Sequence, residues 1–431
     1  MTARVRLYVA ASFTWFSSIA AAQGELSITP LPFDYAWRVA GDGSTVAGSS
    51  GSNLDGNLTA YSWSSSAGAQ AIGAFAPHGV SYDGSVVVGR RAQPSIYGDA
   101  YVEPVSGDRA WCWDAVNGAQ DMGFLHSGDL LAGATDVSAD GNVITGFSGK
   151  YMGPSASFRA WRWTPATGMV ELPQPPNGHG MTIGDSISSD GERVFGYSRI
   201  GGWPDNSRRG YHWDNNGTTV EELLISDLPD PSASLKPIRN VLNGTVVFNG
   251  VYSWSQDAEY WQTDGIWPAP PDDGVNPAYP LTVSEDGQSV IGWAEDFDGP
   301  FYFRAYIWTA ASGARYLDDV LANAGVSLAG WSFGMIATDV SDDGQTIVGY
   351  GAFNGATRAF VVRGLPPCGP GIGMGDGNMS GSTDGLDIQA FVNILISDGA
   401  SGVGYCAYDM NGDGIVDASD TSLFVSRLLI S

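Results

Sequence analysis

One phrase repeats along most of this chain and limits the folds that the chain can adopt. The phrase is Val-Ser-x-Asp-Gly-x-x-Val-x-Gly, and it returns about every 40 to 57 residues. Its clear copies centre on five aspartates, Asp83, Asp140, Asp190, Asp286 and Asp343. Asp42 begins a looser copy, and Asn243 stands where a degenerate copy is expected. This period indicates a solenoid or a propeller, because each unit is one supersecondary element that needs its neighbours.

The unit at residues 134–172 is predicted to contain four strands. Asp140-Gly141 makes a tight turn between the first two, since Gly tolerates positive φ and Asp bonds to the local backbone. The third strand alternates, which places Trp161 and Trp163 on one face. Similar aromatic pairs recur in the other units. We expect them to form the core between stacked sheets, and a role as platforms for sugar rings is the alternative.

Counting units from Asp42 to Asp343 predicts an all-β fold, a seven-bladed β-propeller over residues 23–365. The last unit ends near residue 362 without a fourth strand, whereas residues 25–31 read as a strand that precedes the first phrase. We therefore expect the N-terminal strand to pair with residues 358–362 and close the ring. A six-bladed ring, with the fifth repeat as an insertion, is the alternative.

The repeat resembles two known patterns. Its Asp-Gly phrase is similar to the propeller repeats (PD40-like) of periplasmic proteins of the TolB type. It resembles more closely the HAF repeats of secreted bacterial proteins, which share the long phrase and an Arg-Ala-Phe-x-Trp stretch. The resemblance covers residues 36 to 363. It implies a propeller fold and brings no established activity.

The first 22 residues have the features of an export signal. Arg4 and Arg6 precede an apolar stretch, and Ala20-Ala21-Ala22 forms a small-residue cleavage site. No later stretch is apolar enough to span a bilayer. We expect a monomeric protein that is secreted or held at the cell surface. The formal net charge of −26 argues against a nucleic-acid partner, because an acidic surface repels phosphates.

Two acidic loops near the C-terminus have the spacing of calcium ligands. The loop at residues 409–420 has side-chain oxygens at positions 1, 3, 5, 9 and 12, and Gly414 stands where the chain must turn sharply. The loop at residues 376–387 has the same spacing, but Ser380 at position 5 predicts weaker binding. We predict one Ca²⁺ ion in each loop. The predicted ligands are Asp376, Asn378, Ser380, Ser382, Asp384, Asp387, Asp409, Asn411, Asp413, Ile415 (through its carbonyl), Asp417 and Asp420.

Each loop precedes one expected amphipathic helix, at residues 388–396 and 421–429. Their expected inner faces contain Phe391, Leu395, Leu423, Phe424 and Leu428. Two tandem loop–helix units with Asp at position 12 resemble a type I dockerin module, here at residues 366–431. The resemblance implies two calcium ions and docking to a cohesin domain of a partner protein. A calcium-stabilised cap that packs on the propeller of the same chain is the alternative.

The resemblance also implies which residues contact the partner, because the family uses loop positions 10 and 11 and the following helix. The corresponding residues are Gly385, Leu386, Ala418 and Ser419 in the loops, and Val392, Asn393, Val425, Ser426 and Arg427 on the helices. The tail contains Cys368 and Cys406, and a disulfide between them is plausible in an oxidising compartment. Cys112 lies between two tryptophans and is expected to be buried and inert.

The sequence shows no catalytic motif of the Gly-x-Ser-x-Gly, His-Glu-x-x-His or phosphate-loop kind. The acidic pairs Asp272/Asp273 and Asp296/Asp298 are the candidates for glycan hydrolysis. We expect a non-catalytic propeller that binds a protein or an extracellular glycan through its loops and docks through its tail. The alternative is a polysaccharide-degrading enzyme, a glycoside hydrolase or lyase, delivered by the same tail.

Two further sets of charged residues recur with the repeat. The aspartates of the Asp-Gly phrase are expected to serve the turns rather than to bind a metal or a substrate. One arginine begins the third strand of most units and is expected to pair with a carboxylate of a neighbouring turn. These arginines are Arg109, Arg159, Arg209, Arg304 and Arg358. The variable stretches between the second and third strands are where a binding function would be located.

Overall fold

The predicted four-strand unit recurs along the chain in a computed structural model. The structure describes residues 26–51, 57–92, 107–150, 157–176, 180–199, 208–214, 217–222, 234–240, 246–251, 259–262, 265–266, 278–285, 289–295, 303–309, 313–365, 375, 385, 387–396, 408, 410, 418 and 420–429. The helices within these ranges are all too short or too polar to cross a membrane.

In these ranges the strands form seven antiparallel sheets of four strands each, and six sheets pair their strands in chain order. Three of the six contain β2 (Tyr35–Val39), β3 (Thr45–Ser50), β4 (Thr59–Ser64), β5 (Gly68–Gly73); β6 (Ala76–Val80), β7 (Val86–Arg90), β8 (Trp111–Asp114), β9 (Gly118–Asp121); and β10 (Leu131–Val137), β11 (Ile144–Lys150), β12 (Ser157–Thr164), β13 (Gly168–Glu171). The other three contain β14 (Thr182–Ile187), β15 (Val194–Arg199), β16 (Arg208–Asp214), β17 (Thr219–Glu222); β18 (Ser234–Asn240), β19 (Val246–Val251), β20 (Glu259–Gln262), β21 (Gly265–Ile266); and β22 (Ala278–Val283), β23 (Ser289–Glu295), β24 (Phe303–Thr309), β25 (Gly313–Tyr316).

The seventh sheet joins the two ends of the repeat region. Its strand order is β1 (Ser27–Pro30), β28 (Ala356–Arg363), β27 (Ile347–Phe353) and β26 (Trp331–Val340). Ile28 pairs with Val362 and Pro30 with Phe360, and the Leu31 N–H donates to the Ala359 carbonyl at 2.8 Å. The predicted closure by the N-terminal strand is therefore confirmed.

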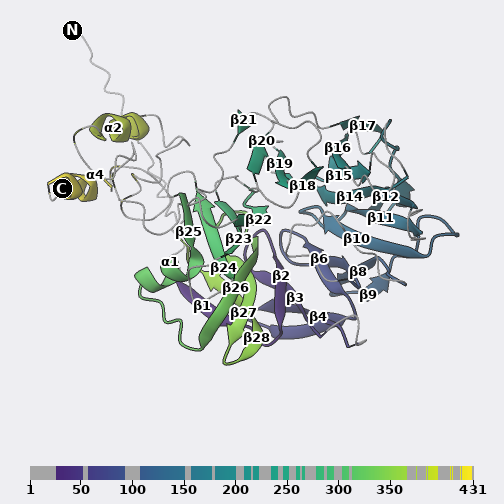
Figure 1. Ribbon diagram of the computed structural model, residues 1–431, viewed down its shortest axis with the longest axis horizontal. Coiled ribbons are helices and arrows are strands. Elements are labelled where there is room, and N and C mark those ends of the chain that lie inside the picture. The colour runs from purple at the N-terminus through teal and green to yellow at the C-terminus, as the bar shows by residue number, and fades with distance from the viewer. Residues whose placement is uncertain are drawn as a thin grey trace, which may run out of the picture.

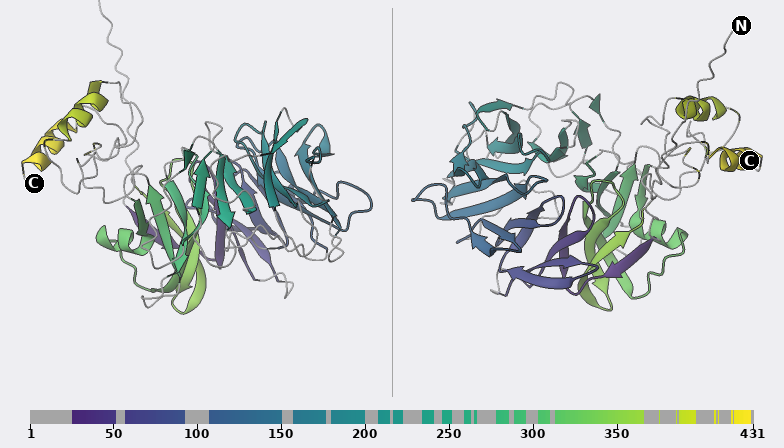
Figure 2. Two further views of the ribbon diagram at one scale, coloured as in Figure 1. Left: turned by 45° about the horizontal axis from the view of Figure 1, so that its top comes forward. Right: turned by 180° about the vertical axis from the view of Figure 1, so that it is seen from behind.

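The sheets are arranged in a ring. The first strands of successive sheets contact each other, from β2 to β6 and onward to β26, and β26 contacts β2. Figure 1 shows the sheets side by side around one axis, and Figure 2 shows the same ring tilted and from behind. The innermost strand of each sheet is the first strand of its repeat unit, which is β26 in the closing sheet. The architecture is therefore that of a β-propeller.

The core of the ring lies between neighbouring sheets, where the aromatic side chains of the third strands are buried or partly buried. Trp161 of β12 packs against Val88 and Ala110, which belong to the preceding sheet. Tyr211 and Trp213 of β16 pack with Val143 and Ala160 of the sheet before theirs. Burying each large side chain contributes about 1.5–3 kcal/mol. The prediction that these aromatics form the core is confirmed, and burial excludes Trp161, Tyr211 and Trp213 as platforms for sugar rings.

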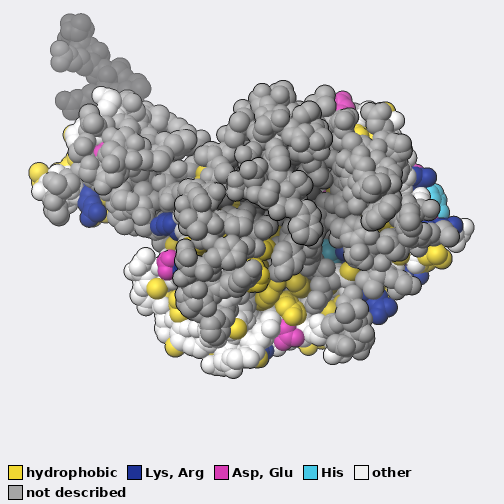
Figure 3. All heavy atoms as spheres, in the orientation of Figure 1, with side chains coloured by type: hydrophobic (Ala, Val, Ile, Leu, Met, Phe, Trp, Pro, Cys, Tyr) yellow, Lys and Arg dark blue, Asp and Glu magenta, His cyan; other side chains and the backbone are white. Residues whose placement is uncertain are grey.

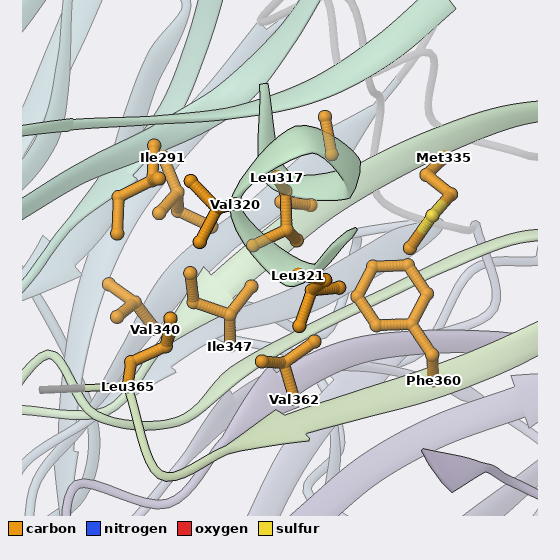
Figure 4. Close-up of a cluster of buried hydrophobic side chains, with 13 residues drawn as sticks. Ile291, Leu317, Val320, Leu321, Met335, Val340, Ile347, Phe360, Val362 and Leu365 are labelled. Atoms are coloured by element: carbon orange, nitrogen blue, oxygen red, sulfur yellow. The ribbon is translucent and has the colours of Figure 1, made fainter. Parts of the chain in front are cut away.

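A helix that the sequence analysis did not predict covers the closing sheet. Helix α1 (Leu317–Asn323) follows β25, and its buried residues Leu317, Val320 and Leu321 join the same apolar cluster as Phe360 and Val362 of β28. Figure 4 shows these side chains converging from the helix and from the strands below it. Leu26 and Ile28, at the N-terminal strand, also pack against this cluster. The helix therefore stabilises the place where the ring closes.

The repeated aspartates hold the turns between the first and second strands. Asp140 Oδ1 accepts hydrogen bonds from Ser138 Oγ at 2.6 Å and from the Asn142 N–H at 3.0 Å, and Gly141 has φ of +74°. The same bonds occur at Asp83, Asp190 and Asp343, whereas Asp286 lies outside the described residues. The structural role predicted for these four aspartates is confirmed.

We expect Asp140→Ala to lower the free energy of unfolding by about 1 kcal/mol at neutral pH, because the exposed carboxylate accepts three local hydrogen bonds. Although burial raises the pKa of Asp140, hydrogen bonds from Ser138 and Asn142 outweigh it and leave that pKa below its ordinary value. The stabilisation is therefore present above the unfolded pKa of about 3.9 and is lost as pH falls below it. Urea unfolding at pH 7 and pH 3 measures this, with Glu192→Ala as the control. An equal loss at both pH values would contradict the prediction.

For three of the repeated arginines the predicted partner was wrong. Arg109 pairs with Asp121 at 2.6 Å and Arg159 with Glu171 at 3.3 Å, both within one sheet. Arg304 pairs with Asp318, at the start of α1, at 2.8 Å. The start of a third strand lies opposite the end of its antiparallel fourth strand, so the nearest carboxylate is there and not in the next sheet's turn.

The C-terminal module contains α2 (Ile388–Ile396) and α4 (Thr421–Leu428), which lie outside the ring (Figure 1). Phe391 and Phe424, one from each helix, have ring centroids 4.2 Å apart, and Tyr408 and Met410 complete their buried cluster. The predicted inner faces are confirmed with one exception. Leu423 is exposed, because its position on α4 is not on the one face that packs against α2.

Candidate functional site

Most of the predicted calcium ligands lie outside the described residues. These are Asp376, Asn378, Ser380, Ser382, Asp384, Asp409, Asn411, Asp413, Ile415 and Asp417. The remaining two, Asp387 and Asp420, are the last ligand of each loop, and the side chains of both are fully buried. A buried carboxylate is costly unless hydrogen bonds or a cation compensate it.

Each of these aspartates stands where its loop meets its helix. The Asp420 carbonyl accepts from the Phe424 N–H at 2.9 Å, and Asp420 Oδ1 accepts from the Met410 N–H at 2.7 Å. Since Met410 is the second residue of the 409–420 loop, this bond holds the two ends of the loop together. A loop that wraps around one ion requires this closure, so the arrangement fits a calcium site.

Asp387 is the equivalent residue of the first loop. Its carbonyl accepts from the Phe391 N–H at 3.1 Å and from the Tyr408 hydroxyl at 3.0 Å. Tyr408 directly precedes the second loop, so this contact connects the end of one loop to the start of the other. The two predicted sites therefore belong to one structural unit and should respond together to the loss of calcium.

The residues implied to contact a partner are exposed where the structure describes them. Gly385, Val392, Ala418, Val425, Ser426 and Arg427 are at the surface, whereas Leu386, Ser419 and the side chain of Asn393 lie outside the described residues. Two exposed apolar residues were missing from the predicted contact set: Ile388 and Leu429. The spacing of four residues between Ile388 and Val392, and between Val425 and Leu429, would have indicated one continuous stripe on each helix.

Cys112 is half-buried and has no disulfide partner, and Cys368 and Cys406 lie outside the described residues. Burial raises the pKa of the Cys112 thiol to about 11, and the nearby Asp114 carboxylate adds to this effect. We expect no reaction of the folded protein with a thiol reagent at pH 8, because almost no thiolate is present. Unfolding without reductant should expose one reactive thiol per chain if Cys368 and Cys406 form a disulfide. Three reactive thiols per chain would contradict the disulfide.

The catalytic alternative depends on titratable side chains of the ring, of which the structure describes a part. No three His, Cys, Asp or Glu side chains there are placed to hold a metal ion. The acidic pairs Asp272/Asp273 and Asp296/Asp298 fall outside the described residues. His78 is buried and bonds to the Ala92 carbonyl at 2.8 Å, and His126 pairs with Glu171 at the surface.

Comparisons with known proteins agree with the organisation of the tail. The family model "Dockerin type I domain" matches residues 374–429. Type I dockerin domains bind calcium, in accord with the position of Asp387 and Asp420. The search of curated proteins found no match.

Among solved structures, similar folds include the β-propeller domain of the Trilobed protease from Pyrococcus furiosus, with a TM-score of 0.49 and 14% identity over 78% of this chain and 94% of that one. An oligogalacturonate lyase from Vibrio parahaemolyticus has a TM-score of 0.48 and 11% identity over 79% and 91%. An acylaminoacyl peptidase from Pyrococcus horikoshii has a TM-score of 0.46 and 12% identity over 77% and 53%. These likenesses say nothing about the activity of this chain.

Proposed function

We propose that this chain is a secreted, non-catalytic binding protein. Residues 1–22 serve as its export signal, and residues 23–365 form a seven-bladed propeller of HAF-type repeats that presents loops to a protein or a glycan. Residues 366–431 form a dockerin-like module that binds two calcium ions and docks to a cohesin-type partner outside the cell. The exposed apolar stripes on α2 and α4 carry this proposal.

The count of seven blades is supported by the contacts of the first strands. Sheet β18–β21 comes from the degenerate fifth repeat, yet β18 contacts both β14 and β22. These contacts support a position of the fifth repeat within the ring over the alternative of an insertion outside it. The closing pair, β26 with β2, completes the circuit.

The docking surface is supported by where apolar side chains are exposed. In the described part of the chain, nine large apolar side chains are exposed, and five of them lie on or directly after α2 and α4. Hydrophobic side chains are visible at the surface of this module in Figure 3. Val392 and Val425 occupy equivalent positions in the two loop–helix units. Apolar side chains concentrated in this way mark an interaction site.

We expect Val425→Asp to weaken binding to a cohesin domain by at least about tenfold, because a desolvated charge would be placed in the interface. Leu130→Asp is the matched control, since Leu130 is an exposed apolar residue of the ring. Titration calorimetry against a panel of cohesin domains, with calcium and then with EDTA, measures both. Calcium-independent binding, or equal losses for the two variants, would contradict docking through α4. Polysaccharide turnover abolished by one Asp or Glu change would contradict the non-catalytic role.

A further inference from the structure

The turns between first and second strands meet at one end of the axis, where backbone hydrogen bonds link them. The Asp342 N–H donates to the Gly41 carbonyl at 2.9 Å, and the Asp42 N–H donates to the Tyr82 carbonyl at 3.0 Å. In the same way the Tyr82 N–H donates to the Ala139 carbonyl, and the Ala139 N–H donates to the Ser189 carbonyl, both at 3.0 Å. Five consecutive sheets are joined in this way. We call the surface formed by these residues the turn-end surface.

The linkage continues through side chains at the degenerate repeat. Ser189 Oγ donates to Glu285 Oε1 at 2.5 Å, which connects the sheet of β14 directly to that of β22. Glu285 is buried, and it occupies the same position of the repeated phrase as Tyr82 and Asp342. The turn-end surface is therefore a floor on which the turns of six of the seven sheets are linked by hydrogen bonds.

Tyr82 stands out on this floor. It is 49% exposed, and no other aromatic side chain of the described residues is among the large exposed ones. The neighbouring floor positions are small, namely Gly41, Ala139 and Ser189. A β-carbon at Gly41 would overlap both the Tyr82 ring and the Asp342 carboxylate. An aromatic ring and a carboxylate therefore both lie against the same glycine.

The charge of this end of the ring is negative. The turns contribute Asp42, Asp83, Asp140, Asp190 and Asp343. Hydrogen bonds from Ser85 and Ser81 hold the pKa of Asp83 below its ordinary range, and bonds from Ser188 and Glu192 do the same for Asp190. The nearby arginines are engaged within the ring: Arg162 donates to the Gly191 carbonyl, Arg363 donates to the Ser44 carbonyl, and Arg193 pairs with Asp214.

We propose that the turn-end surface binds a basic segment of a partner protein, with one Lys or Arg side chain placed against the Tyr82 ring and beside the Asp342 carboxylate. A cation over an aromatic face is attracted by the ring quadrupole, and an adjacent carboxylate adds a charge-assisted hydrogen bond. The surrounding carboxylates attract a positively charged segment over a longer range. This surface lies at the opposite end of the ring from the variable loops, and its role does not depend on the tail.

The test uses the full-length protein in calcium and a fluorescent octamer of lysine and arginine as the probe, with fluorescence anisotropy as the readout. We expect Tyr82→Ala and Asp342→Asn each to weaken binding by about two- to fivefold, and the double variant by roughly tenfold. Tyr82→Phe keeps the ring and should bind as the unaltered protein does. Val116→Ala is the control, since Val116 is an exposed apolar residue in a turn at the same end of the ring, far from the axis.

Three outcomes would overturn the proposal. The unaltered protein could fail to bind the octamer at 0.15 M salt. It could bind with the same affinity after Tyr82→Ala, which would mean a diffuse electrostatic attraction without the ring. A neutral oligosaccharide, rather than the octamer, could depend on Tyr82, which would make this a glycan site. The binding of a cohesin domain to each variant, measured in parallel, separates these outcomes from a failure of the tail.

Discussion

Removal of calcium with EDTA should unfold the C-terminal module while the ring keeps its structure. Asp387 and Asp420 are fully buried carboxylates in a module whose shared core is a small cluster around Phe391 and Phe424. Without a cation, two buried negative charges remain in a unit too small to compensate them by apolar burial. The metal and the fold of residues 374–429 are therefore expected to be lost together.

Two optical signals separate the module from the ring. The tail from residue 366 onward contains no tryptophan, so tryptophan fluorescence reports on the ring alone. Circular dichroism at 222 nm is dominated by helix, and α2 and α4 supply most of it. We expect EDTA to remove the dichroism signal and leave the fluorescence unchanged. A melt that is indifferent to EDTA in both signals would contradict calcium-dependent folding.

Single substitutions test which of the two loops binds calcium more tightly. Asp420→Asn removes a charged ligand and weakens the bond that the Met410 N–H donates, a loss of about 1.5–3 kcal/mol for a hydrogen bond to a charged group. Asp387→Asn should have the smaller effect on calcium affinity, because the 376–387 loop has Ser380 where a carboxylate is usual. Calcium titrations of both variants, followed by calorimetry, compare them. A larger loss for Asp387→Asn would reverse the predicted order of the two sites.

Much of the ring could be predicted because its determinants are local. A Ser-x-Asp-Gly turn carries its own hydrogen bonds, and strand alternation fixes which aromatics are buried, as at Ser138, Asp140 and Trp161. The closure was accessible because a strand was missing at one end of the chain and present at the other. These features repeat, so each copy supports the interpretation of the next.

The features that could not be predicted depend on contacts between units. The first strand of each unit has a register irregularity, and at two of these a threonine hydroxyl bonds to the next sheet. Thr135 Oγ1 donates to the Gly184 carbonyl at 2.7 Å, and Thr338 Oγ1 donates to the Ala36 carbonyl at 2.8 Å. The repeat phrase does not predict which residue of the next sheet accepts such a hydrogen bond. Helix α1 and the partner of Arg304 were missed for the same reason.

For the calcium loops, in contrast, local spacing was enough to predict a set of ligands. The buried positions of Asp387 and Asp420 agree with that set.

The contact surface of the tail was predicted only in part. The residues of the family pattern were carried over by position, but Ile388 and Leu429 were not among them and are exposed because α2 and α4 cover only one face of each other. Helical spacing identifies these residues once the position of the shared core is known, and that position is known only from the folded structure.

The closure of the ring by its N-terminal strand gives the second large expected effect. Deletion of residues 26–31 removes three apolar side chains that pack at the closing sheet, Leu26, Ile28 and Leu31. The fully buried Leu31 contributes about 1.5–3 kcal/mol and the partly buried Leu26 and Ile28 contribute less, but the sum is a large fraction of the stability of a typical domain. The deletion also leaves β28 as an open edge, which invites pairing with a second chain. We expect a ring that unfolds at much lower urea concentration, or a soluble aggregate.

A point substitution tests the same claim without removing backbone. Leu31→Ala should lower the free energy of unfolding by about 2–5 kcal/mol, because Leu31 is only 1% exposed and its neighbours Val361 and Ala359 belong to the last blade. Val170→Ala, in the outer strand β13, should change it by less than about 0.5 kcal/mol, since Val170 is half exposed. Urea unfolding followed by tryptophan fluorescence compares the two. If Leu31→Ala and the deletion both left the unfolding midpoint unchanged, the N-terminal strand would not be what closes the ring, because neither its packing nor its hydrogen bonds to β28 would contribute to stability.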